Sequence, residues 1–177
     1  MSIHSFLNIN TEIPFYLRDW LSYSDSLTDR LQARAGDAQL QLLSHAWGQR
    51  SWWDQYVLDI LDDHVIHREI MMYAHSEACW YARTIIPKHS YASDPLFFNR
   101  LHKESLGALI YDEPRIQRVT MEPYAMNDQC IEYHWLSPFL RELPSVLWGR
   151  LSELRFNTAF PFYLMEIMLP PLQRYSN

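Results

Sequence analysis

The chain has 177 residues, of which 48% are hydrophobic and 15% aromatic, with four glycines and a formal net charge of -6. This composition is typical of one compact domain spanning residues 1–177, and it argues against disorder. The acidic balance, without any Lys- or Arg-rich run, argues against a nucleic-acid partner.

Sequence features also bear on location. The start, Met1–Phe6, lacks the basic and apolar regions of a secretory signal, and no stretch reaches the roughly 18 uncharged apolar residues of a membrane span. The two cysteines, Cys79 and Cys130, are spaced like neither a zinc site nor a redox pair. We therefore expect a cytoplasmic protein with no stable membrane insertion.

The first third of the chain predicts helices followed by a strand. Pro14 fits the first position of a short helix, and Ser24–Asp25 offers an N-cap for a second helix over 26–35, which Gly36 ends. Alternating residues over 38–42 predict a half-exposed strand.

An aromatic segment follows and predicts a helix. Ser51 would cap this helix, and Trp52, Tyr56 and Ile60 would pack inward from it. In an acidic chain we interpret these aromatic side chains as core or lid rather than as a stacking platform for bases.

The rest of the chain predicts antiparallel strands with one more helical region. Strands Ile66–Tyr73 and Trp80–Pro87 form a hairpin, and Asp94–Pro95 starts a helix. A strand over 115–122 ends at Pro123, and a last hairpin pairs 147–156 with 161–170. The expected fold class is α+β, a mainly antiparallel sheet covered by helices.

Three charged residues stand on otherwise apolar strand faces. Glu166 shares a face with Phe162, Leu164 and Met168, while Arg68 and Arg83 each stand alone among apolar residues of their own strands. One inward carboxylate and two inward guanidinium groups would make a small closed pocket for an anionic ligand. A purely structural ion pair is the alternative, and spacing leaves both possibilities open.

Metal and nucleotide sites find no support in the sequence. His64 and His67 would point to opposite faces of a strand, and the other six histidines are scattered. There is no G-x-S-x-G motif, glycine-rich phosphate loop or Cys-His signature. We expect no metal and no organic cofactor.

An ordered series of sequence blocks resembles the bacterial chorismate pyruvate-lyase family, from about Trp20 to Tyr175. No block is specific alone, but their order is. The blocks are Trp20-Leu21, Asp25–Leu31, Arg68–Ile70, Ala82–Pro87, Leu106-Gly107, Arg118 with Glu122, Leu147–Arg150 and Glu166–Pro170.

The resemblance implies an antiparallel sheet of about six strands, a ligand cavity beneath helical flaps and a monomer. Family members cleave chorismate to 4-hydroxybenzoate and pyruvate without a cofactor, on the route to ubiquinone. By resemblance, Arg68 and the backbone amides of Leu27 and Leu106 hold the ligand carboxylate, Arg83 is the arginine of the G-R-T block, and Glu166 faces the 4-hydroxyl.

We therefore hypothesise that Arg68 anchors the ring carboxylate, that Arg83 binds the enolpyruvyl group, and that Glu166 is the acid/base residue. This chain has Ala82 where the family has glycine, Leu151 in place of a second arginine, and a longer connection over 124–146. Two other functions stay open. One is a non-catalytic domain binding small aromatic acids, as in effector domains of transcription regulators, and the other is a lyase giving another hydroxybenzoate isomer.

Overall fold

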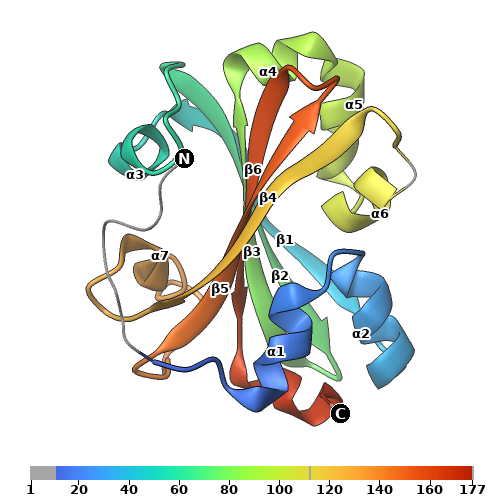
Figure 1. Ribbon diagram of the computed structural model, residues 1–177, viewed down its shortest axis with the longest axis vertical. Coiled ribbons are helices and arrows are strands. Elements are labelled where there is room, and N and C mark those ends of the chain that lie inside the picture. The colour runs from blue at the N-terminus through green and yellow to red at the C-terminus, as the bar shows by residue number, and fades with distance from the viewer. Residues whose placement is uncertain (1–10, 112, 177) are drawn as a thin grey trace.

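The computed structural model describes residues 11–111 and 113–176, so the N-terminal segment Met1–Phe6 lies outside the described residues. A six-stranded antiparallel sheet in the order β1-β2-β3-β6-β5-β4 runs through the molecule (Figure 1), which confirms the predicted α+β class. The elements are α1 Phe15–Ser22, α2 Leu27–Ala35, β1 Gln39–Gln49, α3 Trp52–Tyr56, β2 His64–Ala74, β3 Glu77–Pro87, α4 Lys88–Ser93, α5 Pro95–Asn99, the 3-10 helix η2 Arg100–His102, α6 Leu106–Tyr111, β4 Ile116–Met126, α7 Ile131–His134, β5 Leu147–Phe156, β6 Phe160–Met168 and the 3-10 helix η3 Pro170–Tyr175.

Tight turns join the two predicted hairpins. His75 and Ser76 link β2 to β3, and Asn157, Thr158 and Ala159 link β5 to β6. His75, Ser76, Asn157 and Thr158 have positive φ, between 47° and 68°, a backbone conformation that tight hairpin turns commonly use. These turns fix the register of four of the six strands.

The predicted end of the fourth strand at Pro123 is wrong. β4 continues through Pro123 to Met126 and pairs with β5 along its length. Because β4 is an edge strand, the missing N–H of Pro123 is tolerated. The first strand is also longer than predicted, since β1 runs on to Gln49.

The predicted helix caps are largely confirmed. Ser26 rather than Ser24–Asp25 caps α2, accepting a hydrogen bond from the Asp29 amide at 3.2 Å, and Gly36 ends the helix with φ 72°. Ser51 caps α3 in a reciprocal capping box with Asp54.

The packing predicted for this segment is confirmed for Ile60, which is buried beyond the end of α3, and is wrong for Trp52 and Tyr56. Trp52 and Tyr56 are 53% and 54% exposed, and Trp53 is buried instead. A helix of five residues has too few turns for the inward stripe that the sequence suggested.

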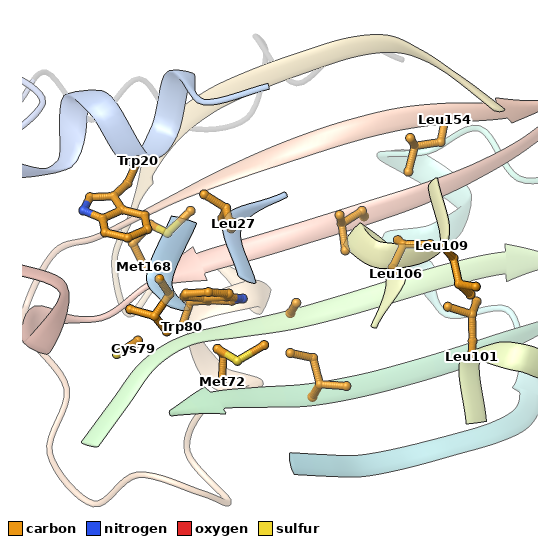
Figure 2. Close-up of a cluster of buried hydrophobic side chains, with 14 of the residues drawn as sticks. Trp20, Leu27, Met72, Cys79, Trp80, Leu101, Leu106, Leu109, Leu154 and Met168 are labelled. Carbon is orange, nitrogen blue, oxygen red and sulfur yellow. The ribbon is translucent and has the colours of Figure 1, made fainter. Parts of the chain in front are cut away.

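Each face of the sheet carries its own hydrophobic core. On one face, which we call the pocket face, Trp20 of α1, Leu27 of α2 and Leu106 of α6 pack over Met72 and Trp80 of the sheet (Figure 2). On the opposite face, α3 and α7 cover a second cluster that includes Trp53, Tyr81 and Met165. Figure 1 shows α2 and α6 on one side of the sheet and α3 and α7 on the other. In the described parts of the chain, every helix is too short or too polar to traverse a lipid bilayer.

Candidate functional site

A pocket lies on the pocket face, between the sheet and the starts of α2 and α6. We call α2 with residues 24–26, and α6 with Ser105, the two flaps. The volume open to the centres of water molecules is about 40 Å³, room for roughly three waters. The lining residues are Asp25, Ser26, Leu27, Thr28, Leu40, Arg68, Ile70, Met72, Trp80, Ala82, Ser105, Leu106, Gly107, Ile110, Arg118, Arg150, Leu164 and Glu166.

A buried ion pair forms the floor of this pocket. Arg150 of β5 lies directly opposite Glu166 of β6, and its Nε donates to Glu166 Oε2 at 2.6 Å. The two side chains are 1% and 8% exposed. Only Oε2 accepts a hydrogen bond from the described residues, so Oε1 stays available to a ligand. The pair fixes the carboxylate in orientation and neutralises its charge.

Arg150 also links the floor to the first flap. Its Nη1 donates to the carbonyl oxygens of Trp20, at 3.2 Å, and of Tyr23. Trp20 lies in the last turn of α1, and Tyr23 follows α1 at the start of the turn into α2. Sequence reasoning did not select Arg150 as a site residue, although it belongs to one of the blocks that carry the family resemblance.

Arg68 is a buried cation held by carbonyl groups. Its Nε donates to the Leu101 carbonyl at 2.8 Å and its Nη2 to the Glu104 carbonyl at 3.0 Å, just before α6. The side chain is almost fully buried, and desolvation lowers the pKa of Arg68 to about 10. Within the described chain no carboxylate lies at ion-pair distance from Arg68, so its charge faces the pocket uncompensated.

Arg118 of the edge strand β4 is a third cation lining the pocket. Its Nη1 donates to the Ser24 carbonyl at 2.6 Å, while its buried Nε has no partner among the described residues. Desolvation lowers the pKa of Arg118, against the opposing fields of Glu166 and Asp25. Sequence reasoning missed Arg118 as a site residue, because a single arginine on a polar edge strand carries no pattern of its own.

The expectation that Arg83 shares the pocket with Arg68 and Glu166 is wrong. Ala82, not Arg83, lies across from Glu166, so Arg83 points to the opposite face. There its guanidinium lies 4.4 Å from the ring centroid of Trp135 and 4.0 Å from Glu69. The alternation along each strand was predicted correctly, but the sequence left open which face of β3 aligns with which face of β2.

Leu27 and Leu106 are the first residues of α2 and α6, and both line the pocket with buried side chains. Helix geometry leaves the first backbone amides without partners inside the helix. The two helix starts nearly touch, because a Cβ on Gly107 would lie 3.1 Å from the Ser26 hydroxyl oxygen. The flaps therefore meet above the charged floor.

The buried part of the lining is positively charged overall. The buried Arg68 and Arg150 and the half-buried Arg118 face one buried carboxylate, Glu166, while Asp25 is exposed to water. Among the described residues, no three His, Cys, Asp or Glu side chains gather as metal ligands. Such a lining is suited to a small ligand with more than one negative charge.

A sequence model of one family, described as chorismate lyase, matches residues 8–176. The chain belongs to the chorismate lyase family. A probable chorismate pyruvate-lyase of Aromatoleum aromaticum is 27% identical over 165 residues, covering 90% of this chain and 88% of that protein. The chorismate pyruvate-lyase of Citrobacter koseri is 26% identical over 160 residues, covering 90% and 86%.

Solved structures of regulators share the fold of this chorismate lyase family member. The ligand-binding domain of a putative GntR-family transcriptional regulator from Bordetella bronchiseptica superposes with a TM-score of 0.53 at 14% identity, covering 76% of this chain and 84% of that one. A GntR-family transcriptional regulator from Bacillus cereus superposes with a TM-score of 0.54 at 15% identity, covering 76% of this chain and 92% of that one. At these identities the likeness shows the fold alone.

Proposed function

We propose that this chain is a chorismate lyase that converts chorismate to 4-hydroxybenzoate and pyruvate, a reaction that would supply ubiquinone synthesis. One observation carries the proposal: the uncompensated guanidinium of Arg68 and the fixed carboxylate of Glu166 line the same pocket. The family membership supports the same substrate class. The cytoplasmic location and the monomeric state stay predictions.

Arg68 would anchor the ring carboxylate of the substrate. Two of its five N–H groups are bound to the Leu101 and Glu104 carbonyls, which leaves three for a ligand. Because those carbonyls are neutral, an incoming carboxylate gains the full interaction with the cation. By the family resemblance, the amides of Leu27 and Leu106 at the helix starts would complete this carboxylate site.

Glu166 would serve the reacting end of the ring. With Oε2 held by Arg150, its Oε1 would accept a hydrogen bond from the 4-hydroxyl and take the proton from C4. The C4–H electron pair forms the third ring double bond while the C3–O bond breaks toward oxygen. The enolpyruvate that leaves takes up a proton at its terminal carbon and becomes pyruvate, so atoms and charge balance.

The flaps would have to separate during each turnover. The open volume of about 40 Å³ holds a few waters, whereas a ring with two carboxylates needs more room. Movement of α2 and α6 would admit the substrate and release the aromatic product, and strong inhibition by added 4-hydroxybenzoate is the expected sign of slow release.

Mixing the purified protein with chorismate tests the proposal. We expect 4-hydroxybenzoate, identified by ultraviolet absorbance and chromatography, and pyruvate in equal amounts, with and without a metal chelator. Another hydroxybenzoate would point to a different lyase. Absence of turnover together with tight binding of aromatic acids would favour the binding-module alternative that the shared fold keeps open. A sample without protein controls for spontaneous decay of chorismate.

A further inference from the structure

The charged groups of the pocket leave one cation without an assigned role. Glu166 neutralises Arg150 at 2.6 Å, and Arg68 would take the ring carboxylate. Arg118 is then the remaining guanidinium, partly buried, with an unpartnered Nε and an Nη1 that donates to the Ser24 carbonyl and to Met121 Sδ at 3.5 Å, both uncharged acceptors. Desolvating a cation costs free energy unless an anion or strong acceptors compensate it. A second anionic group of the ligand would supply that compensation.

The sheet order places Arg118 on the far side of the reacting centre from Arg68. Arg68 stands on β2 and Arg118 on β4, while Glu166 and Arg150 stand on β6 and β5 between them. A ligand whose ring carboxylate meets Arg68 and whose 4-hydroxyl meets Glu166 therefore has its C4 end directed toward β4. In chorismate the enolpyruvyl ether is on C3, next to C4.

We propose that Arg118 binds the carboxylate of the three-carbon side chain that leaves as pyruvate, and thereby distinguishes substrate from product. The role rests on the proposed function. Substrate has two carboxylates for Arg68 and Arg118, whereas 4-hydroxybenzoate has one, for Arg68 alone. A cation beside the ether oxygen also favours the negative charge that develops as the C3–O bond breaks.

The Ser24 carbonyl connects this recognition to the first flap. Ser24 lies two residues before the Ser26 cap of α2, and its carbonyl accepts from Arg118 Nη1. A carboxylate bound to the same guanidinium would hold the flap and the substrate side chain together. Loss of pyruvate removes that carboxylate, so the product is held through the Arg68 end.

A matched set of variants tests the role of Arg118. Arg118→Gln removes its charge, Arg118→Lys keeps it, and Arg68→Gln removes the cation shared by both ligands. Arg115→Gln is the control, because Arg115 is an exposed residue near the start of β4 that pairs with Glu113 and Asp94 away from the pocket. Thermal unfolding verifies that each variant is folded.

Two affinities are compared in each variant, the KM for chorismate and the dissociation constant for 4-hydroxybenzoate. We expect Arg118→Gln to raise the KM about 10- to 100-fold, the loss of one charge-assisted hydrogen bond, and to lower kcat. The 4-hydroxybenzoate constant should change less than threefold. Arg118→Lys should give a KM between those of the wild type and Arg118→Gln. Arg68→Gln should weaken the binding of both ligands by similar factors. Equal weakening of both ligands by Arg118→Gln, or no effect on either, would overturn the role.

The same variants separate this role from the lyase activity. Calorimetric titration with chorismate in a Glu166→Gln background measures substrate binding without rapid turnover. A wild-type protein that binds chorismate but does not cleave it refutes the lyase, while the Arg118 prediction is still decided by the dissociation constants. A protein that does not bind chorismate refutes both.

Discussion

The two faces of the sheet bury charged side chains in different ways. On the opposite face, Glu69 accepts from the Tyr81 hydroxyl at 2.5 Å and lies 4.0 Å from Arg83, whose guanidinium covers Trp135. On the pocket face, Arg68 and Arg118 donate to neutral backbone carbonyls. The first arrangement places a carboxylate at ion-pair distance from its arginine, although the buried Arg83 Nε makes no hydrogen bond among the described residues. The second leaves the charge of Arg68 facing open volume.

The difference separates structural charges from charges available to a ligand. Burial raises the pKa of Tyr81, and the hydrogen bond to Glu69 raises it further, so the hydroxyl stays protonated as a donor. On the other face, the uncompensated burial of Arg68 is a cost that a bound carboxylate would offset. The partners of a buried charge, more than its burial, therefore indicate a binding site.

The largest contrast should come from neutralising one carboxylate on each face. Glu166→Gln keeps the shape but removes the base, so we expect kcat on chorismate to fall about 10²- to 10⁴-fold. Glu69→Gln on the opposite face should change kcat less than about threefold, since Glu69 lies outside the pocket lining. Steady-state pyruvate release measures both. Similar losses in the two variants would erase the distinction between the faces.

Removing one arginine from each face should lower the free energy of unfolding by different amounts. Arg150→Met leaves Glu166 buried without its partner, which should lower the free energy of unfolding by about 3–5 kcal/mol. Arg83→Met loses a 4.0 Å ion pair and a cation–π contact, for an expected loss of about 1–2 kcal/mol. Urea unfolding gives both values.

A double variant provides the control for that comparison. Arg150→Met combined with Glu166→Gln removes the unpaired charge and should recover part of the lost stability. If the double variant is as unstable as Arg150→Met alone, lost packing rather than charge explains the effect.

A methyl group at Gly149 should disturb the packing between β5 and β6 beneath the Arg150–Glu166 pair. Its Cβ would lie 2.7 Å from the Glu166 carbonyl oxygen and closer still to Met165 Cε. We expect Gly149→Ala to lower stability by about 1–3 kcal/mol. Gly48→Ala is the matched strand control, because the nearest atom to its Cβ is 3.8 Å away. Thermal and urea unfolding report the change, and equal stability of the two variants would contradict the tight contact between β5 and β6.

The smallest expected effect is a pH dependence from His45 beside Arg68. Burial, the stacked ring of His102 and the charge of Arg68 lower the pKa of His45 from 6.5 to about 4, although the Leu101 carbonyl favours its protonated form. As the pH falls, the unfolded chain therefore takes up this proton before the folded chain does. The free energy of unfolding is undiminished by His45 above about pH 6.5 and decreases as the pH falls toward 4. Urea midpoints across this range should fall in the wild type and fall less in His45→Phe. Identical slopes would remove His45 as the cause.

Much of the fold could be predicted from local chemistry. The hairpins, the caps at Ser51 and Gly36, and the inward positions of Arg68 and Glu166 follow from turn residues and from alternation within one strand. Arg83 could not be placed, because its face depends on the register between β3 and β6, which only the folded sheet shows. Arg150 was not selected as a site residue. The charged residues of β5 are typical of a strand that faces solvent, whereas in the structure β5 is buried on both faces.

A crystal structure with 4-hydroxybenzoate tests most directly which face of the sheet binds the ligand. We predict that the carboxylate of the bound molecule meets the Arg68 guanidinium beneath α2 and α6, and that its hydroxyl lies at hydrogen-bond distance from Glu166 Oε1. A ligand bound beside Arg83 and Trp135, or one whose hydroxyl faces water away from Glu166, would contradict the account.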